Sequence, residues 1–294
     1  MAMNATRKAA VKYLSALLLF GSNGIVASRI AMSSYEIVWT RTLIGGLLLA
    51  AIYLFSKEKK KFWHNKKDMG LIMLSGFAMG ANWMFLYEAY TQIGVSVATL
   101  LCYCGPVIVL ALSTAMFRER MSVAKIVGIS AALLGMVFLN GMSLLSSGFS
   151  WGLACGLLSA VMYALMVVSN KKATSITGLE NAMCQLFAAF FIVSVFIFIK
   201  QGAAISFAVG DVWPILLLGL INTGGGCYLY FSSIQQLRAQ SVAILGYLEP
   251  LSALFFSAII LSERLTWLQL LGAVLILGGA AFAELFRRKA PDKT

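Results

Sequence analysis

Two stretches of this chain decide its fold. The first reads SVATLLCYCGPVIVLALSTAMFRERMSVAKIVGISAALLGM and spans residues 96–136. The second reads SVAILGYLEPLSALFFSAIILSERLTWLQLLGAVLILGGA and spans residues 241–280. Pro106 and Pro250 are 144 residues apart. The same offset relates Tyr103 to Tyr247, Glu119-Arg120 to Glu263-Arg264, Gly128 to Gly272, and Gly135 to Gly279. Matches at one offset that include proline and a charged pair indicate an internal duplication.

The chain around these stretches is too apolar for a soluble protein. Of its 294 residues, 60% are hydrophobic and 12% are charged, whereas a soluble domain has about 45–50% and about 25%. This composition excludes a soluble globule, a disordered chain and a disulfide scaffold. Because the apolar runs are continuous and do not alternate as barrel strands do, the sequence predicts an all-α integral membrane protein.

Ten segments are long and apolar enough to cross a membrane. A helix needs about 20 mostly apolar residues to span a hydrocarbon core of about 30 Å. The segments are Tyr13–Met32, Glu36–Phe55, Met69–Tyr90, Val95–Phe117, Ala124–Asn140, Trp151–Asn170, Asn181–Ile199, Val212–Ser232, Ser241–Ser262 and Thr266–Phe286. The sequence therefore predicts ten transmembrane helices, with short connections between them.

The distribution of basic residues predicts the orientation. Of the 23 Lys and Arg residues, 19 lie in the two tails and the even-numbered loops. The other side keeps Arg29, Arg41, Lys200 and Arg264. Cytoplasmic loops carry an excess of positive charge, so both termini are expected in the cytoplasm. The net charge of +12 is thus a sign of topology and not of nucleic-acid binding. The basic loop Lys57–Lys67 is expected to meet anionic lipid headgroups.

Each copy of the duplicated unit contains five segments. An odd number of crossings forces the two copies into opposite orientations. We therefore predict an inverted pair, with residues 1–140 as the first repeat, residues 151–286 as the second, and residues 287–294 as a basic cytoplasmic tail. Inverted repeats are a recurrent transporter architecture, in which a site at the repeat interface opens to each side in turn.

These features resemble a known family. The ten segments, the duplication and the Pro-(12 residues)-Glu pattern after each fourth helix are similar to the EamA-like branch of the drug/metabolite transporter superfamily. Leu248-Glu249-Pro250 and Arg41 add to the resemblance, which covers nearly the whole chain. It implies export of small metabolites, often amino acids, across a bacterial inner membrane. The first, third, fourth, sixth, eighth and ninth helices would line the cavity.

Glu249 is the leading candidate site residue. It lies eight residues after Ser241, which is about 12 Å along a helix and so near mid-membrane. Its repeat partner is Gly105. Ionisable residues at this depth are costly and functional by default. Glu249 is a candidate for binding a coupling proton or the amino group of a substrate. The alternative is a carboxyl that caps backbone groups freed by Pro250.

Helix-breaking residues mark further candidates. Pro106 and Pro250 each remove a backbone donor inside a span, which predicts hinges beside the site; a static kink is the alternative. Two glycine-containing stretches, 21–24 and 222–226, interrupt the first and eighth spans. Such interruptions indicate a transporter site, or else tight packing of small residues. The candidates from these stretches are Asn23 and Asn222 for substrate binding and Gly224 and Gly225 for a hinge.

Aromatic residues at similar depth complete the candidate site. Their π-faces suit a cation or a ring, although packing is the alternative. The candidates are Trp83, Tyr103, Tyr163, Tyr228 and Tyr247. Arg41 is a candidate for attracting carboxylates, but a structural bond to Glu36 or to loop carbonyls is the favoured role.

Other classes of function are weaker. The five Cys lie in apolar segments and the single His64 lies in a loop, so we predict no metal, cofactor or nucleic-acid partner. An intramembrane enzyme would need a polar catalytic set, and a scaffold or receptor would lack a central cavity. A passive channel is disfavoured by the inverted repeat. Within transport, large neutral amino acids and organic cations or amines both stay open as substrates. The sequence contains no signal for oligomeric state.

Overall fold

The computed structural model describes residues 2–56, 65–117, 122–140, 150–202, 209–260 and 266–285. These residues form helices and the turns between them, and no strand. The elements are α1 (Ala2–Gly21), α2 (Asn23–Ala27), α3 (Ser34–Phe55), α4 (Lys66–Ile93), α5 (Val95–Cys102), α6 (Gly105–Phe117), α7 (Val123–Asn140), α8 (Trp151–Lys172), α9 (Gly178–Gln201), η2 (Val209–Asp211), α10 (Val212–Leu216), η3 (Leu217–Gly225), α11 (Gly226–Ile234), α12 (Ala239–Gly246), α13 (Leu248–Ile260) and α14 (Trp267–Leu285). The predicted tail 287–294, both Glu-Arg pairs and residues 57–64 of the basic loop lie outside the described residues.

Within the described ranges, eight helical spans are long and apolar enough to cross a membrane. They are Ala5–Ala27, Ser34–Phe55, Lys66–Ile93, Val97–Phe117, Trp151–Lys172, Gly178–Lys200, Val212–Ile234 and Ala239–Ile260. Two shorter apolar helices, Val123–Phe138 and Trp267–Phe282, occupy the places of the predicted fifth and tenth spans. The chain is therefore a multi-pass membrane protein, and ten crossings remain a prediction.

Some helices begin at residues other than the predicted ones, because capping or helix propensity determines where a helix starts. α1 begins at Ala2 and not at Tyr13, because the Ala, Lys and Arg residues before the apolar run are strong helix formers. α3 begins at a capping box, in which Ser33 accepts from the Glu36 backbone and the Glu36 carboxylate accepts from the Ser33 backbone. Such a box satisfies donors that a helix start leaves free.

Four spans are interrupted in their interior. The fourth breaks between α5 and α6 at residues 103–104, and the ninth breaks between α12 and α13 at Tyr247. Each break lies just before a proline that cannot donate to the preceding turn. The first span breaks at Ser22, and the eighth widens into the π-helix η3. π-Helical segments are rare in proteins, and those that occur are often at functional sites.

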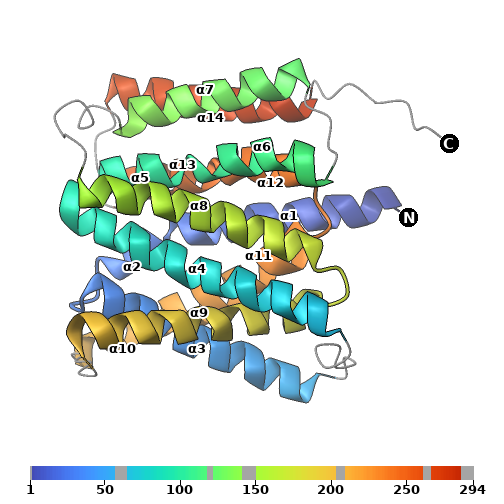
Figure 1. Cartoon of the computed structure of the whole chain (residues 1–294). Helices are drawn as coiled ribbons and strands as arrows, with labels where there is room; N and C mark the ends of the chain where they lie inside the picture. Colours follow the sequence, from blue (N-terminus) through green and yellow to red (C-terminus); the bar gives the residue numbers. More distant parts are fainter. Residues whose placement is uncertain are drawn as a thin grey trace.

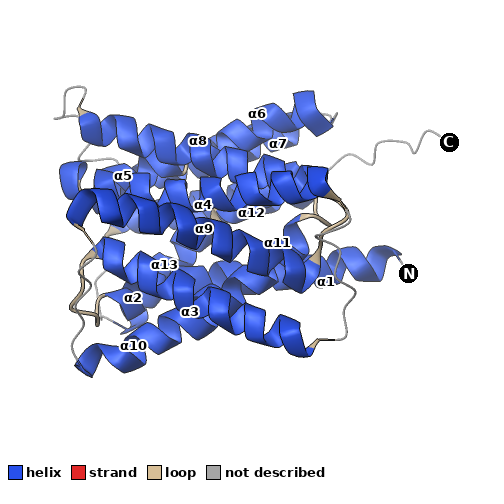
Figure 2. Ribbon diagram, turned by 60° about the horizontal axis from the view of Figure 1, so that its bottom comes forward, coloured by secondary structure: helices blue, strands red, loops and turns tan. Residues whose placement is uncertain are grey.

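The helices lie side by side in a bundle, joined at its two ends (Figures 1 and 2). α7 and α14 pair along one edge of Figure 1, and α3 and α10 lie at the opposite edge. The start of α1 and the end of α14 lie at the same end of the bundle (Figure 1). Contacts cross between the two halves of the chain: α4 packs on α8 and α9, while α11 and η3 pack on α1 and α3.

The pair α7–α14 is joined by glycines that match in the two repeats. A side chain at Gly135 would lie 2.6 Å from the Gly272 carbonyl oxygen, and one at Gly279 would lie 2.5 Å from the Gly128 carbonyl oxygen. The late part of each helix thus meets the early part of the other, so the two helices are antiparallel. Small residues permit such close backbone packing in membranes. The orientation of the repeats relative to the membrane stays a prediction.

Two buried aspartates connect the halves at their ends. Asp68, at the start of α4, accepts hydrogen bonds from the backbone of Thr174 and Ser175 at 2.9 and 2.7 Å. Asp211, at the start of α10, accepts from the Ala31 backbone at 3.0 Å. In both cases the third span of one half holds the loop between the first two spans of the other half.

Candidate functional site

Glu249 lies in the first turn of α13, directly after the break at Tyr247. Its side chain is half-buried. Its carboxylate has no hydrogen bond or ion pair among the described residues, so it makes none of the bonds that the alternative capping role requires. The hydroxyl of Ser252 donates to the Glu249 carbonyl at 2.7 Å. Glu249 therefore stays a candidate for ligand binding.

The carboxylate of Glu249 lies where spans from both halves meet. Seven groups are close enough to interact with its charge. Two of them are Tyr90 of the third span and Cys102 of the fourth. The other five come one each from the first, second, fourth, sixth and eighth spans and are Tyr13, Arg41, Tyr103, Tyr163 and Tyr230. A buried charge interacts strongly with its neighbours because the local dielectric constant is low. We call these five residues and Glu249 the polar centre.

Arg41 turns into this centre, contrary to the expected bond with Glu36. Its Nε donates to the Thr223 hydroxyl at 2.9 Å, and its Cζ lies 4.9 Å from the centroid of the Trp83 ring. Its side chain is 5% exposed. Glu36 is instead occupied by its own capping box, which leaves the guanidinium to bond with the eighth span.

The repeat-matched tyrosines contact each other. The Tyr247 hydroxyl donates to the Tyr103 carbonyl at 3.0 Å, and the two rings are 6.1 Å apart. Tyr247 is fully buried and satisfies a carbonyl at the break in the fourth span. Tyr103 is half-buried and is close enough to interact electrostatically with Glu249. Of the two, Tyr103 is therefore the better placed to meet a substrate.

The position that matches Glu249 in the first repeat explains an asymmetry of the centre. A side chain at Gly105 would lie 2.8 Å from the Tyr163 ring. Gly105 thus makes room for the half-buried Tyr163 of α8. At this matched position, the second repeat contributes the carboxylate of Glu249. The first repeat has Gly105, whose missing side chain leaves space for Tyr163.

Asn222 joins two of the interrupted spans. Its Nδ2 donates to the Leu19 carbonyl at 2.9 Å, the Ser22 hydroxyl at 2.8 Å and Asn23 Oδ1 at 3.0 Å. These bonds satisfy groups at the break in the first span, and Asn222 is 2% exposed. The structure thus gives Asn222 a packing role, while Asn23 stays half-buried.

Gly224 has a packing role as well. A side chain at Gly45 of α3 would lie 3.0 Å from the Gly224 backbone nitrogen, so the two helices touch through glycine. Gly225 has more open surroundings. Motion at Gly224, Gly225, Pro106 and Pro250 stays a prediction.

The other predicted aromatic residues are separated by the fold. Trp83 lies beneath Arg41 at the polar centre. Tyr228 instead faces Lys12, whose Nζ is 5.4 Å from the centroid of its ring. Among the described residues, no group of three or more His, Cys, Asp or Glu side chains is placed to hold a metal.

Tyr13, Tyr230 and Thr223 belong to or support the centre, and the sequence argument did not select them. Thr223 stands inside the glycine-containing stretch 222–226, so that motif was the available signal for it.

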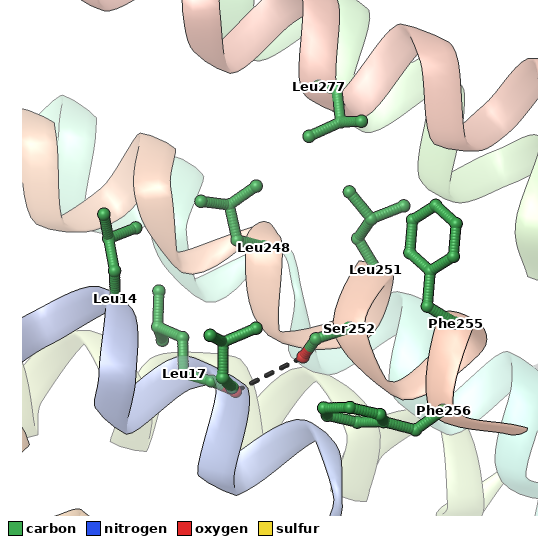
Figure 3. Close-up of a pocket in the computed structure, with 9 residues that line it drawn as sticks. Leu14, Leu17, Leu248, Leu251, Ser252, Phe255, Phe256 and Leu277 are labelled. Atoms are coloured by element: carbon green, nitrogen blue, oxygen red, sulfur yellow. Dashed lines mark hydrogen bonds between the residues drawn. The ribbon is translucent and has the colours of Figure 1, made fainter. Parts of the chain in front are cut away.

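A cavity of about 330 Å³ lies beside α13, apart from the polar centre (Figure 3). It is lined by Leu14, Leu17, Leu18, Leu248, Leu251, Ser252, Phe255, Phe256 and Leu277. The Ser252 hydroxyl points toward the Leu17 carbonyl at 3.3 Å (Figure 3). Leu18 is 53% exposed, so this cavity lies at the surface of the bundle. Neither Glu249 nor Arg41 lines it.

Interrupted helices around buried charges at a repeat interface define a class of protein, the membrane transporter. The chain belongs to the EamA-like transporter family, whose model matches residues 7–141 and again residues 150–284.

Relatives extend over most of the chain. The Bacillus subtilis (strain 168) protein described as uncharacterized transporter YxxF is 26% identical over 97% of this chain and 92% of its own length. The Salmonella typhimurium inner membrane transporter YicL is 25% identical over 98% of each. An Escherichia coli K12 protein described as "Probable amino-acid metabolite efflux pump" is 26% identical over 73% of this chain and 76% of its own.

A solved structure shares the fold. It superposes with a TM-score of 0.81 at 19% identity and covers 96% of this chain and 99% of its own chain. The chain is thus a transporter by family, and it shares its overall fold with this solved structure.

Proposed function

We propose that this protein is a secondary transporter that exports a small organic metabolite, most specifically an amino acid, by alternating access. The observation that carries the proposal is the free carboxylate of Glu249 at the meeting point of both halves. Ionisable residues inside membrane spans mark substrate and ion pathways. The printed name of the Escherichia coli relative supports an amino-acid substrate and an outward direction.

The contacts between the halves support the alternating-access part. Helices α7 and α14 meet through matched glycines in an antiparallel pair. Contacts of α4 with α8 have a counterpart in contacts of α11 with α1. Two halves related in this way are able to exchange conformations and open a central site to either side. The distribution of basic residues supports cytoplasmic termini.

A second candidate function is export of organic cations or amines. Glu249 and the neighbouring tyrosines favour it, because a carboxylate and π-faces attract cations. Arg41 in the same centre disfavours it, since a like charge repels a cation. We therefore rank it second.

Counterflow in proteoliposomes tests the proposal. Vesicles loaded with unlabelled L-phenylalanine or L-leucine should accumulate the labelled amino acid, and Glu249→Gln should slow this exchange by about ten- to a hundredfold, because a charge-assisted hydrogen bond contributes about 1.5–3 kcal/mol. An uncoupler should lower uphill transport if a proton is the coupling ion.

The control is a size-exclusion profile and melting temperature equal to those of the unsubstituted protein. Exchange of amines without exchange of amino acids would favour the second candidate. Unchanged flux in Glu249→Gln would remove this residue from the mechanism.

A further inference from the structure

We propose that the cavity beside α13 is a binding site for an anionic phospholipid, with one acyl chain in the cavity and the phosphate of the headgroup at Arg7. The site lies between α1, α13 and α14 (Figure 3). The inference stands independently of the proposed function, because it concerns a lipid that stays bound and not the transported molecule.

The lining of the cavity is suited to a hydrocarbon chain and unsuited to water. Eight of the nine lining residues are Leu or Phe. The ninth is Ser252, and its hydroxyl already donates to the Glu249 carbonyl at 2.7 Å. A cavity lined by such groups stays dry, because a water molecule needs about two to four polar partners. An empty cavity would forfeit dispersion contacts along its walls, so an apolar group is expected to fill it.

The cavity is accessible from the surface of the bundle. Leu18, Phe255 and Leu277 are exposed at that surface although they line the cavity. Figure 3 shows Leu277 of α14 pointing toward the side chains of Leu248 and Leu251 on α13. In a multi-pass membrane protein, the apolar surface of the bundle faces the hydrocarbon core of the bilayer. The apolar group available to fill the cavity is therefore an acyl chain.

A basic residue lies on the same face of α1 as the cavity. Arg7, Val11, Leu14 and Leu18 are spaced by four, three and four residues, which places them in one stripe along a helix. Leu14 and Leu18 line the cavity, while Arg7 and Val11 are exposed. From Arg7 to Leu14 is about 10 Å along the helix axis. One leaflet of the hydrocarbon core is about 15 Å deep, so a single phospholipid is able to reach from Arg7 into the cavity.

Arg7 is available to bind the phosphate of this lipid. It forms no hydrogen bond or ion pair within the part of the chain that the structure describes. A guanidinium binds a phosphate through two parallel hydrogen bonds. Helix α1 also carries Lys8 and Lys12 but no acidic residue, and basic residues beside a membrane span attract anionic lipids. The charge of α1 therefore favours an anionic headgroup over a zwitterionic one.

A lipid in this position would contact both halves of the chain. Helix α1 belongs to the first matched segment of the family model, and α13 and α14 belong to the second. Helix α1 packs on α13, and the Ser252 hydroxyl lies 3.3 Å from the Leu17 carbonyl oxygen beside the cavity. An acyl chain next to this contact is expected to stabilise the packing of the two halves.

Lipid titration of the delipidated full-length protein in detergent tests the inference. Native mass spectrometry measures the binding of dioleoylphosphatidylglycerol, which is anionic, and of dioleoylphosphatidylcholine, which is zwitterionic and has the same acyl chains. The anionic lipid should bind about fivefold more tightly, the effect of one basic residue near a headgroup. It should also raise the melting temperature, because a ligand of the folded state stabilises that state.

Two smaller probes separate the headgroup from the chain. Dihexanoylphosphatidylglycerol keeps the headgroup and has short chains. It should bind at least about tenfold more weakly than the long-chain lipid, since each methylene group lost from an apolar site weakens binding by about fourfold. Inorganic phosphate should leave the melting temperature unchanged.

Two pairs of variants locate the two parts of the lipid. Leu277→Trp fills the cavity and should weaken binding of both long-chain lipids by at least about tenfold, because it displaces two or more methylene groups. Leu271→Trp changes an exposed residue of the same helix outside the cavity and should bind normally. Arg7→Gln should abolish the preference for the anionic lipid. Arg29→Gln, at an exposed arginine beyond the other end of the first span, should retain it.

The variants are compared only where the size-exclusion profile matches that of the unsubstituted protein, and Leu14→Phe replaces Leu277→Trp if the latter does not fold. Equal binding in the cavity-filling variant and in Leu271→Trp overturns the inference. Equal affinity for the two dioleoyl lipids, or a preference that survives Arg7→Gln, also overturns it. Stabilisation by inorganic phosphate equal to that by the long-chain lipid would indicate a site for a free anion and would overturn it as well.

Discussion

At the residue scale, two tyrosines of the polar centre have hydroxyls in opposite situations. The rings of Tyr13 and Tyr230 are 5.3 Å apart. The Tyr13 hydroxyl donates to the Val242 carbonyl at 2.8 Å and so links α1 to α12. The Tyr230 hydroxyl is buried and has no hydrogen-bond partner among the described residues. Hydrogen bonding, and not burial, therefore distinguishes the two.

Replacing each tyrosine by phenylalanine should separate these roles. Tyr13→Phe loses a bond and leaves a carbonyl unpaired, so it should cost about 1 kcal/mol, or about 2–4 °C in melting temperature. Tyr230→Phe should leave the melting temperature unchanged or raise it, because its hydroxyl is desolvated without compensation. Differential scanning fluorimetry in detergent checks both. A larger loss in Tyr230→Phe than in Tyr13→Phe would contradict this assignment.

At the element scale, the packing of α7 on α14 depends on two backbones that touch. Gly279 meets the Gly128 carbonyl, whereas a side chain at Gly278 would meet no atom within 4 Å. The neighbouring glycines on α14 therefore differ in function. One makes the helix contact, and the other adds only backbone freedom.

This difference gives a matched pair of substitutions. Gly279→Ala should destabilise the protein by about 1–3 kcal/mol, as overpacking does. Gly278→Ala should be neutral or stabilising by up to about 1 kcal/mol, since alanine loses less backbone entropy in a helix. Urea or thermal unfolding of the two purified variants makes the comparison. Equal stabilities would show that the α7–α14 contact is not close.

At the scale of the whole molecule, the halves hold each other at both ends of the bundle. Asp68 binds the loop at Thr174, and Asp211 binds the loop at Ala31. If the repeats are inverted, these two equivalent contacts lie on opposite faces of the membrane. Both Thr174 and Ala31 are exposed, so each face is open to a chemical probe.

Cysteine labelling tests the inverted arrangement. In a chain whose five native Cys are replaced, Thr174→Cys should react with a membrane-impermeant maleimide only from the cytoplasmic face, and Ala31→Cys only from the outside. Right-side-out and inside-out vesicles give the two readings. Labelling of both positions from one face would exclude an inverted repeat.

Sequence patterns located some features of the site because their signals are local. Proline predicted interruptions of the fourth and ninth spans, and both spans are broken just before Pro106 and Pro250. The mid-membrane depth of Glu249 was predicted by counting residues along one helix, and it stays a prediction. Arg41 was misassigned, because its expected partner Glu36 is one turn away in sequence while its actual partner, Thr223, is 182 residues away.

The sequence by itself determined that the chain is a membrane protein and that it is built from two copies of one unit. Both properties follow from patterns along the chain. The length of the apolar runs indicates the membrane, and the fixed offset between matched residues indicates the duplication. The tertiary structure alone decided which polar groups meet. Tyr13, Arg41, Tyr163, Tyr230 and Glu249 come from five different spans, and only close packing between those spans brings their charges and hydroxyls within reach of one another.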